Sequence, residues 1–297
     1  MHELLQWSWF YPTALALLSV GVALLERARP ARASQPVVRS RLWSDVLHLV
    51  FNGHVLGVVL YAAGAAWLAP PFDAWLATMG WTESFYRSAA EAWPVWVQIP
   101  IALLVIDFIH WCIHNLLHRI PALWQFHKTH HSVQADEMDW IVAFRFQWTE
   151  VVVYKLIQFA PLAWLGFGLE AVMFHAVFGT LIGHLNHANV DLDYGPLRYV
   201  FNSPSMHLWH HAHPEEQPQT VNFGIIFSIW DWVFGTAHLP DQPPQRLGFP
   251  GDETFPPTWF EHQVWPVSRV WQHHPQHRLI SGVLGAGLVA SVWVLVA

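Results

Sequence analysis

Histidines in this chain gather in short clusters whose spacing suits the binding of metal ions. The chain has 21 histidines among 297 residues. The first cluster is the pair His114 and His118, and two further clusters of the form His-x-x-His-His span residues 127–131 and 207–211. Residues at positions i, i+3 and i+4 share one face of a helix, so the imidazoles of one cluster can converge on one ion.

These clusters supply enough imidazoles for two metal ions. A further pair with i, i+3 spacing brings the number of candidate ligands to ten, whereas one ion takes roughly four to six. The candidate metal ligands are His114, His118, His127, His130, His131, His184, His187, His207, His210 and His211. Imidazole ligation without thiolates suits iron, copper or zinc, and the ligand types alone do not choose among them. The single cysteine, Cys112, excludes a CxxC metal site.

Three carboxylates are candidates for the groups that orient these imidazoles. A histidine that binds a metal usually donates its other ring N–H to a carboxylate or a carbonyl. Asp107 is a candidate because a carboxylate inside an apolar segment needs a structural or chemical reason. Glu150 and Asp231 are further candidates, although either side chain could instead cap a helix or pair with an arginine.

The composition indicates that apolar helices position these residues within a membrane. The chain is 54% hydrophobic and 12% charged, about half the charge of a usual soluble domain. It also contains 20 tryptophans, a residue that suits the bilayer interface. The apolar segments lie at 4–25, 46–69, 93–113, 151–185 and 279–297, and a Gly-Phe-Gly break at 166–168 makes the fourth a helical hairpin.

The distribution of arginine predicts the side of the membrane on which the histidines lie. Five arginines fall between residues 27 and 41, and an excess of arginine marks a cytoplasmic loop. The polar segments 114–150 and 186–278 then face the cytoplasm as well. We therefore expect an all-α, polytopic integral membrane protein with a cytoplasmic, helical, histidine-rich metal-binding cap. The net charge of −7 argues against a nucleic-acid partner, which would need a basic surface.

The clusters and their flanking residues resemble the fatty acid hydroxylase (sterol desaturase) superfamily from about residue 40 to residue 260. The matching segments are Asp107-Phe-Ile-His-Trp-Cys-Ile-His-Asn-Leu-Leu-His118, Leu123-Trp-Gln-Phe-His-Lys-Thr-His-His-Ser132, Asn186-His-Ala-Asn-Val190, Ser203-Pro-Ser-Met-His-Leu-Trp-His-His211, Asn222-Phe-Gly224 and Trp230-Asp-Trp-Val-Phe-Gly-Thr236. Asn115, Gln147 and Phe223 depart from the residues Arg, His and Tyr that are common in the family. His184 is not a constant feature of the family pattern.

The resemblance implies a di-iron centre that activates O2 and hydroxylates or desaturates a membrane lipid-like substrate. It divides the chain into N-terminal transmembrane helices and connecting loops (1–92), a catalytic domain of spans and cytoplasmic cap (93–278), and a C-terminal transmembrane helix (279–297). The chain has no haem motif of a cytochrome b5 domain, no dinucleotide-binding glycine motif and no cysteine set for an iron–sulfur cluster. Electrons must therefore come from a separate donor, a ferredoxin or a cytochrome with its reductase.

Three other functions use histidines in membranes. A zinc hydrolase needs a carboxylate within its ligand motif, as in HExxH, and the chain has no such motif. A b-type cytochrome could ligate haem through His48, His54, His110 and His175, but the dense clusters would then have no role. Metal transporters usually bind their ions near the bilayer midplane, whereas these clusters lie at the membrane border.

Overall fold

The computed structural model describes residues 9–56, 59, 66–67, 69–80, 88–133, 137–192 and 194–273. Within these residues the protein is helical, as predicted, and its only β pairings are two isolated bridges. The predicted span 279–297 lies outside the described residues, as do the first residues of the predicted span 4–25 and most of the second half of 46–69.

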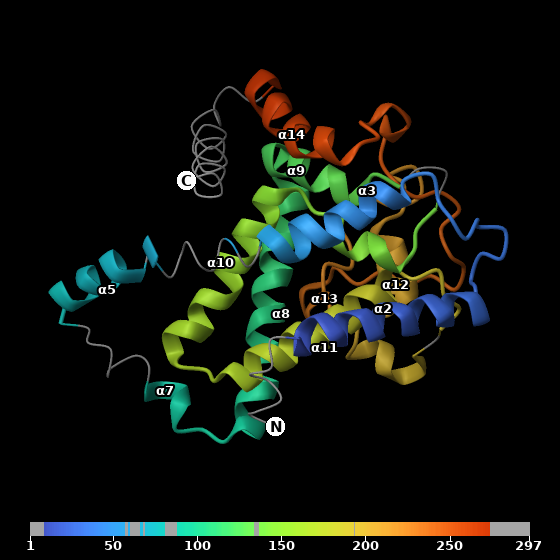
Figure 1. Cartoon of the computed structure of the whole chain (residues 1–297). Helices are drawn as coiled ribbons and strands as arrows, with labels where there is room; N and C mark the ends of the chain where they lie inside the picture. Colours follow the sequence, from blue (N-terminus) through green and yellow to red (C-terminus); the bar gives the residue numbers. More distant parts are fainter. Residues whose placement is uncertain are drawn as a thin grey trace.

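The helices are distributed along the whole described part of the chain (Figure 1). They are α2 (Phe10–Ala28), α3 (Leu42–Leu47), the π-helix η1 (His48–Val55), α5 (Ala69–Thr78), α7 (Ser88–Glu91), α8 (Val95–Arg119), α9 (Pro121–His131), the 3-10 helix η4 (Trp140–Phe144), α10 (Trp148–Leu165), α11 (Leu169–His187), the 3-10 helix η5 (Gly195–Tyr199), α12 (Pro204–His210), α13 (Ile229–Phe234), the 3-10 helix η6 (Asp252–Thr254) and α14 (Trp259–His273).

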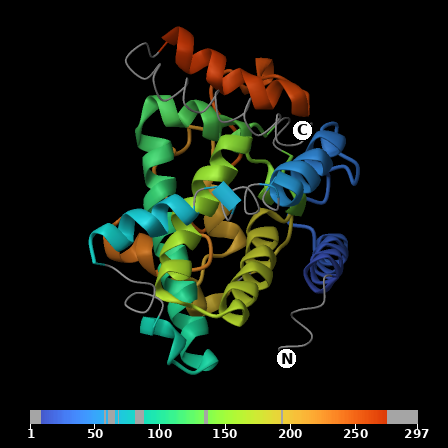
Figure 2. The same ribbon diagram turned by 60° about the vertical axis from the view of Figure 1, so that its left-hand side comes forward.

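Helices α8, α10 and α11 form the centre of the molecule (Figure 2). The predicted hairpin is confirmed, because α10 ends at Leu165 and α11 begins at Leu169. Gly166 in the turn has φ +78°, a conformation that favours glycine. Both helices of the hairpin pack against α8, and α11 also packs against α2. Ala102 and Ile106 of α8 meet Leu162 and Ala171 of the hairpin in one apolar cluster.

Two of the described helices, α2 and α8, are long and apolar enough to cross a membrane. Large apolar side chains cover their outer surfaces, such as Leu17 (69% exposed) on α2 and Trp96 (75% exposed) on α8. Exposure of this kind suits a lipid environment, because contiguous apolar surface is rare on soluble monomers.

Prolines begin the two helices that carry the His-x-x-His-His clusters. Pro121 is the first residue of α9 and forces Ile120 into an extended conformation, so the chain turns between α8 and α9. Pro204 likewise begins α12, and the Ser203 hydroxyl caps this helix by accepting from the Met206 N–H at 3.3 Å. The turn at Ile120 allows the end of α8 and the length of α9 to face one another.

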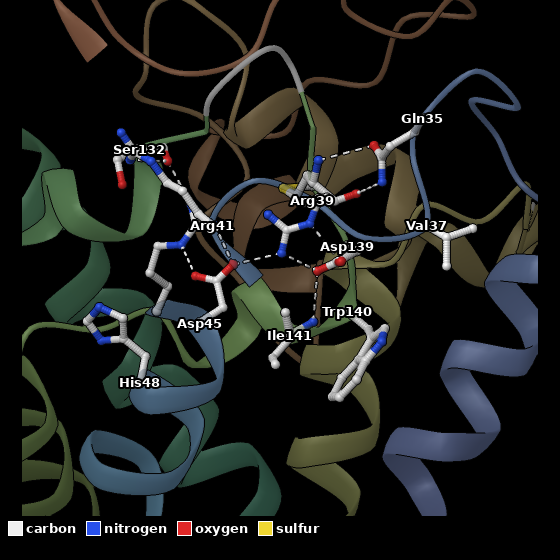
Figure 3. A network of polar contacts seen from close by, with 12 residues as sticks. Gln35, Val37, Arg39, Arg41, Asp45, His48, Ser132, Asp139, Trp140 and Ile141 are labelled. Atoms are coloured by element: carbon white, nitrogen blue, oxygen red, sulfur yellow. Dashed lines mark hydrogen bonds and ion pairs between the residues drawn. The ribbon is translucent and has the colours of Figure 1, made fainter. Parts of the chain in front are cut away.

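Buried ion pairs attach the segment before α3 to η4 (Figure 3). Asp45 accepts from Arg39 at 2.7 Å and from Arg145 at 2.6 Å, and Arg39 also donates to Asp139 at 2.7 Å. Arg39 and Arg41, two of the five arginines behind the topology prediction, are thus buried inside the protein and do not lie at a membrane surface. Of the five arginines, only Arg27, Arg29 and Arg32 therefore remain as evidence that this loop is cytoplasmic.

A second buried contact joins η1 to α14 and should make stability depend on pH. His262 Nδ1 lies 3.0 Å from His48 Nε2, and His262 donates through Nε2 to the Pro256 carbonyl at 2.7 Å. Burial, followed by the nearby His48, lowers the pKa of His262 to about 3. Arg41 and Arg145 lower it further, and the Pro256 carbonyl opposes the shift.

We expect the protein to lose stability as the pH falls from 7 to 5. Because the unfolded histidine titrates near pH 6.5, the unfolded chain binds a proton in this range that folded His262 rejects, at a cost of about 2 kcal/mol. Thermal unfolding of the metal-loaded protein in detergent, measured across this range, tests the expectation. Other buried histidines contribute to the same slope, so His262→Gln should make the pH dependence shallower without abolishing it. An unchanged slope in this variant would contradict the assignment.

Candidate metal centre

Nine of the ten predicted ligands come together in two compact groups. Within each group, one ligand atom of every histidine lies within 4.8 Å of the ligand atoms of the others. Group A consists of His114, His118, His127, His131 and His210; group B consists of His130, His187, His207 and His211. All of these side chains are buried except that of His118, which is half-buried.

Both His-x-x-His-His clusters are divided between the two groups. In each cluster the i, i+4 pair stays together, so His127 and His131 join group A and His207 and His211 join group B. The histidine at i+3 turns to the other group, so His130 joins group B and His210 joins group A. The groups are therefore interleaved neighbours, and the rings of His131 and His211 stack with their centroids 4.2 Å apart.

The ring nitrogens of group B face one another at distances that suit one shared ion. The Nε2 atom of His187 lies 3.1 Å from that of His130 and 2.9 Å from that of His207, which in turn lies 3.2 Å from that of His211. Imidazole nitrogens bind such metals at about 2.0–2.1 Å, which places two ligands of one ion roughly 3 Å apart. The group B nitrogens therefore fit a metal ion.

The hydrogen bonds of group A leave lone pairs that require a cation. His114 Nδ1 must donate its hydrogen to the Phe223 carbonyl, 2.8 Å away, because a carbonyl can only accept. His127 Nδ1 donates in the same way to the Glu150 carboxylate at 2.9 Å. The two Nε2 atoms then carry lone pairs, yet they lie 3.0 Å apart. A metal ion bound by both nitrogens removes this repulsion.

Burial keeps the imidazoles of α9 and α12 neutral, and the neutral form is the one that binds metals. Desolvation, followed by the neighbouring histidines, lowers the pKa of several members well below the usual histidine value. This holds for His127, His130, His131, His207 and His211. At neutral pH these rings therefore offer lone pairs to a metal without first losing a proton.

Only one of the three predicted carboxylates contacts a histidine directly. Glu150 accepts from His127 at 2.9 Å, and its second oxygen is buried without a partner in the described part of the chain. Asp107 instead accepts from the backbone N–H groups of Ile226 and Phe227 at 2.8 and 3.0 Å and from the Trp230 indole at 3.0 Å. The reason for a carboxylate in this apolar helix is thus to hold the loop before α13.

Asp231 acts on the histidines through the backbone. Its carboxylate accepts from the N–H groups of Phe223 and Gly224, both at 2.9 Å. This fixes the turn at 221–224, whose carbonyls at Val221 and Phe223 accept from His210 and His114, each at 2.8 Å. The sequence pattern included this turn, as Asn222-Phe-Gly224, but not the role of its carbonyls as histidine acceptors.

The structure does not bring His184, the tenth candidate, to either group. Its Nε2 lies 3.1 Å from the Ser19 hydroxyl of α2, and its Nδ1 lies 3.1 Å from the Trp140 carbonyl. Both ring nitrogens thus have partners at the packing contact of α11 with α2 and η4. Its neighbour His187 donates Nδ1 to the Gly183 carbonyl at 2.8 Å and turns Nε2 to group B.

A mostly apolar cavity of about 180 Å³ reaches group B at His187. It lies among α2, η1, α8, α10 and α11, and its lining includes Ile106, Val151, Phe159 and Ile226. An apolar cavity with few polar groups suits a hydrocarbon chain, and its position directs that chain to the group B histidines.

Comparison with known proteins identifies the class of this site. The family model described as fatty acid hydroxylase matches residues 99–236. Ornithine lipid hydroxylase OlsE of Rhizobium tropici is 29% identical over 238 residues, which cover 79% of this chain and 69% of that protein. The alkylglycerol monooxygenases of Caenorhabditis elegans and Homo sapiens are 28% and 29% identical, over 58% and 48% of this chain.

The extent of these matches differs between the relatives. The matched part of this chain covers only 34% and 31% of the two alkylglycerol monooxygenases. No solved protein structure matches this chain. The relatives, together with the apolar helices α2 and α8, indicate a membrane protein. Residues 99–236, which match the fatty acid hydroxylase family, contain all nine histidines of groups A and B, and the relatives are hydroxylases and monooxygenases.

Proposed function

We propose that this protein hydroxylates an unactivated C–H bond of a membrane lipid, with two iron ions bound by groups A and B. The observation that carries the proposal is the meeting of an apolar cavity with two adjacent histidine groups inside a fatty acid hydroxylase domain. The names of the relatives, an ornithine lipid hydroxylase and alkylglycerol monooxygenases, support a lipid substrate.

The reaction consumes O2, two electrons and two protons, and it converts R–H to R–OH and water. Bound iron supplies the activation of O2, and a separate ferredoxin or cytochrome with its reductase supplies the electrons. The nine histidines of the two groups hold the ions, and Glu150 keeps the His127 ring in place through Nδ1. The apolar wall of the cavity excludes water and orients the chain so that one carbon faces His187.

The same proposal extends to the topology of the chain. Helices α2, α8 and the α10–α11 hairpin lie in the membrane, and the residues that follow α8 and α11 form a cap on the cytoplasmic side. The division into residues 1–92, 93–278 and 279–297 follows from this arrangement. Labelling of single cysteines placed in 114–150 and 186–278, in sealed vesicles of known orientation, tests the side on which the cap lies.

Metal analysis and product analysis together test the function. Protein purified from iron-supplemented cells should contain about two non-haem irons per chain with the Mössbauer spectrum of a coupled pair. Supplied with O2 and a reducing system, it should add one oxygen atom to an ornithine lipid or an alkylglycerol, detected by mass spectrometry. Haem, or a single zinc ion that persists after iron supplementation, would disprove the proposal, and loss of two hydrogens without added oxygen would indicate desaturation.

A further inference from the structure

We infer that the cavity binds a lipid whose alkyl chain lies along one face of α11 and whose oxygen-bearing group hydrogen-bonds to Tyr154. The inference rests on the proposed function and specifies its substrate. The lipid would be one with a hydroxyl, ether or carbonyl oxygen near the carbon that is oxidised. Two separate observations support it: two glycines in the cavity wall whose packing would accept alanine, and a buried hydroxyl that lacks a partner among the described residues.

The face of α11 that lines the cavity leads directly to the metal centre. Gly179, Gly183 and His187 follow one another at intervals of four residues, so they share one helix face. All three line the cavity, as do the small residues Ala176 and Thr180 on the same side. A chain lying along this face would therefore end at a histidine of group B.

The packing of the protein does not require glycine at either position. Neither residue has the positive φ that favours glycine. A Cβ atom at Gly183 would lie 3.9 Å from the nearest side-chain atom, on Ala143, and one at Gly179 would lie 3.6 Å from the His175 ring. Both are ordinary contacts, and glycine inside a helix is less stable than alanine. The glycines therefore keep space open for an occupant of the cavity.

Tyr154 is one of the polar side chains that line this mostly apolar cavity. Its side chain is only 6% exposed, and its hydroxyl has no hydrogen-bond partner among the residues that the structure describes. Its ring stacks on His110 with centroids 4.5 Å apart, and His110 is held in turn by Gln158 at 2.7 Å. A buried hydroxyl without a partner is unfavourable, so a ligand oxygen beside it would satisfy the group.

Equilibrium binding of two radiolabelled probes to the purified, detergent-solubilised full chain tests the inference without turnover. The probes are a hexadecyl glycerol ether and hexadecane, which have the same chain with and without oxygen. Gly179→Ala and Gly183→Ala should weaken binding of both probes about tenfold, because each adds a methyl group to the occupied space. Tyr154→Phe should weaken binding of the ether about fivefold and leave hexadecane unchanged.

Gly21→Ala is the matched control for the glycine variants. Gly21 lies in α2, and no heavy atom lies within 4 Å of the position of an added Cβ. This variant should bind both probes as the wild type does, and none of the alanine variants should unfold at a lower temperature than the wild type.

The outcomes separate this inference from the proposed function. Wild-type affinity in both glycine variants would overturn the inference even if the enzyme hydroxylates lipids. An equal loss of affinity for both probes in Tyr154→Phe would also overturn it. The expected pattern of binding would uphold it even if the purified protein formed no hydroxylated product, and the proposed reaction alone would then fail.

Discussion

His187→Ala should lose the metal bound at group B and reduce turnover by more than about 100-fold, whereas His184→Ala should retain both. The two histidines lie one helical turn apart on α11, and both are buried, with 2% and 0% exposure. They differ in what their rings contact. His187 Nε2 lies within 3.1 Å of two other group B nitrogens, whereas His184 bonds to Ser19 and the Trp140 carbonyl.

The size of the expected effect follows from the role of the ring. Changes to groups that merely orient a ligand typically cost 10–100-fold in metal affinity or activity, so removal of a ligand should cost at least as much. Iron content by elemental analysis, measured beside the turnover of a lipid substrate, tests the prediction. An equal loss of iron in His184→Ala and His187→Ala would show that general damage to α11, and not ligation, explains the result.

The histidines of groups A and B could be predicted as candidate ligands because their signal is local. Spacings of three and four residues depend only on helix geometry, and the flanking residues in the family pattern agree with them. The division of each cluster between two groups could not be predicted in the same way. It depends on the direction from which α8, α11 and α12 approach α9, which is set by contacts between residues far apart in the chain.

The partners of the three carboxylates could not be predicted, because the sequence does not show which groups each carboxylate contacts. Asp107 and Asp231 have the expected residue type near the expected histidines, but both accept from backbone N–H groups of the loop between residues 223 and 227. These donors lie up to 120 residues away from Asp107 in the chain. Glu150 is a candidate of the same standing as Asp231, and its contact with His127 appears only once α9 and α10 are packed together.

In the sequence, Arg39 and Arg41 indicate only the side of the membrane on which their loop lies. Their burial in the structure leads to a prediction about stability. Asp45 is fully buried and lies between the guanidinium groups of Arg39 and Arg145. Burial alone would raise the pKa of Asp45, but the charges of Arg145 and Arg39 outweigh it and lower the pKa to about 2. The carboxylate therefore stays ionised at any pH at which the protein would be handled.

The ion pairs also hold the C-terminal end of α9, where two of the proposed metal ligands, His130 and His131, lie. Arg145 donates through Nη1 to the Ser132 carbonyl at 2.7 Å, and Ser132 directly follows His131. Arg145 in turn is fixed by Asp45, which accepts from Nε at 2.6 Å and from Nη2 at 2.8 Å. Loss of the Asp45 charge should therefore disturb the position of His130 and His131 as well as the attachment of the N-terminal segment.

We expect Asp45→Asn to destabilise the protein by about 3–5 kcal/mol, because it leaves the buried guanidinium of Arg145 without a carboxylate and that of Arg39 with Asp139 alone. The thermal midpoint in detergent should fall on the order of 10 °C, and the iron content should fall with it. Glu253→Gln, which removes an exposed carboxylate, is the control and should leave both unchanged. Since Asp45 titrates only near pH 2, the destabilisation should be the same at pH 6 and pH 8. A normal midpoint with reduced iron would mean that the network positions the proposed ligands but does not stabilise the fold. Normal values of both would show that neither arginine depends on this carboxylate.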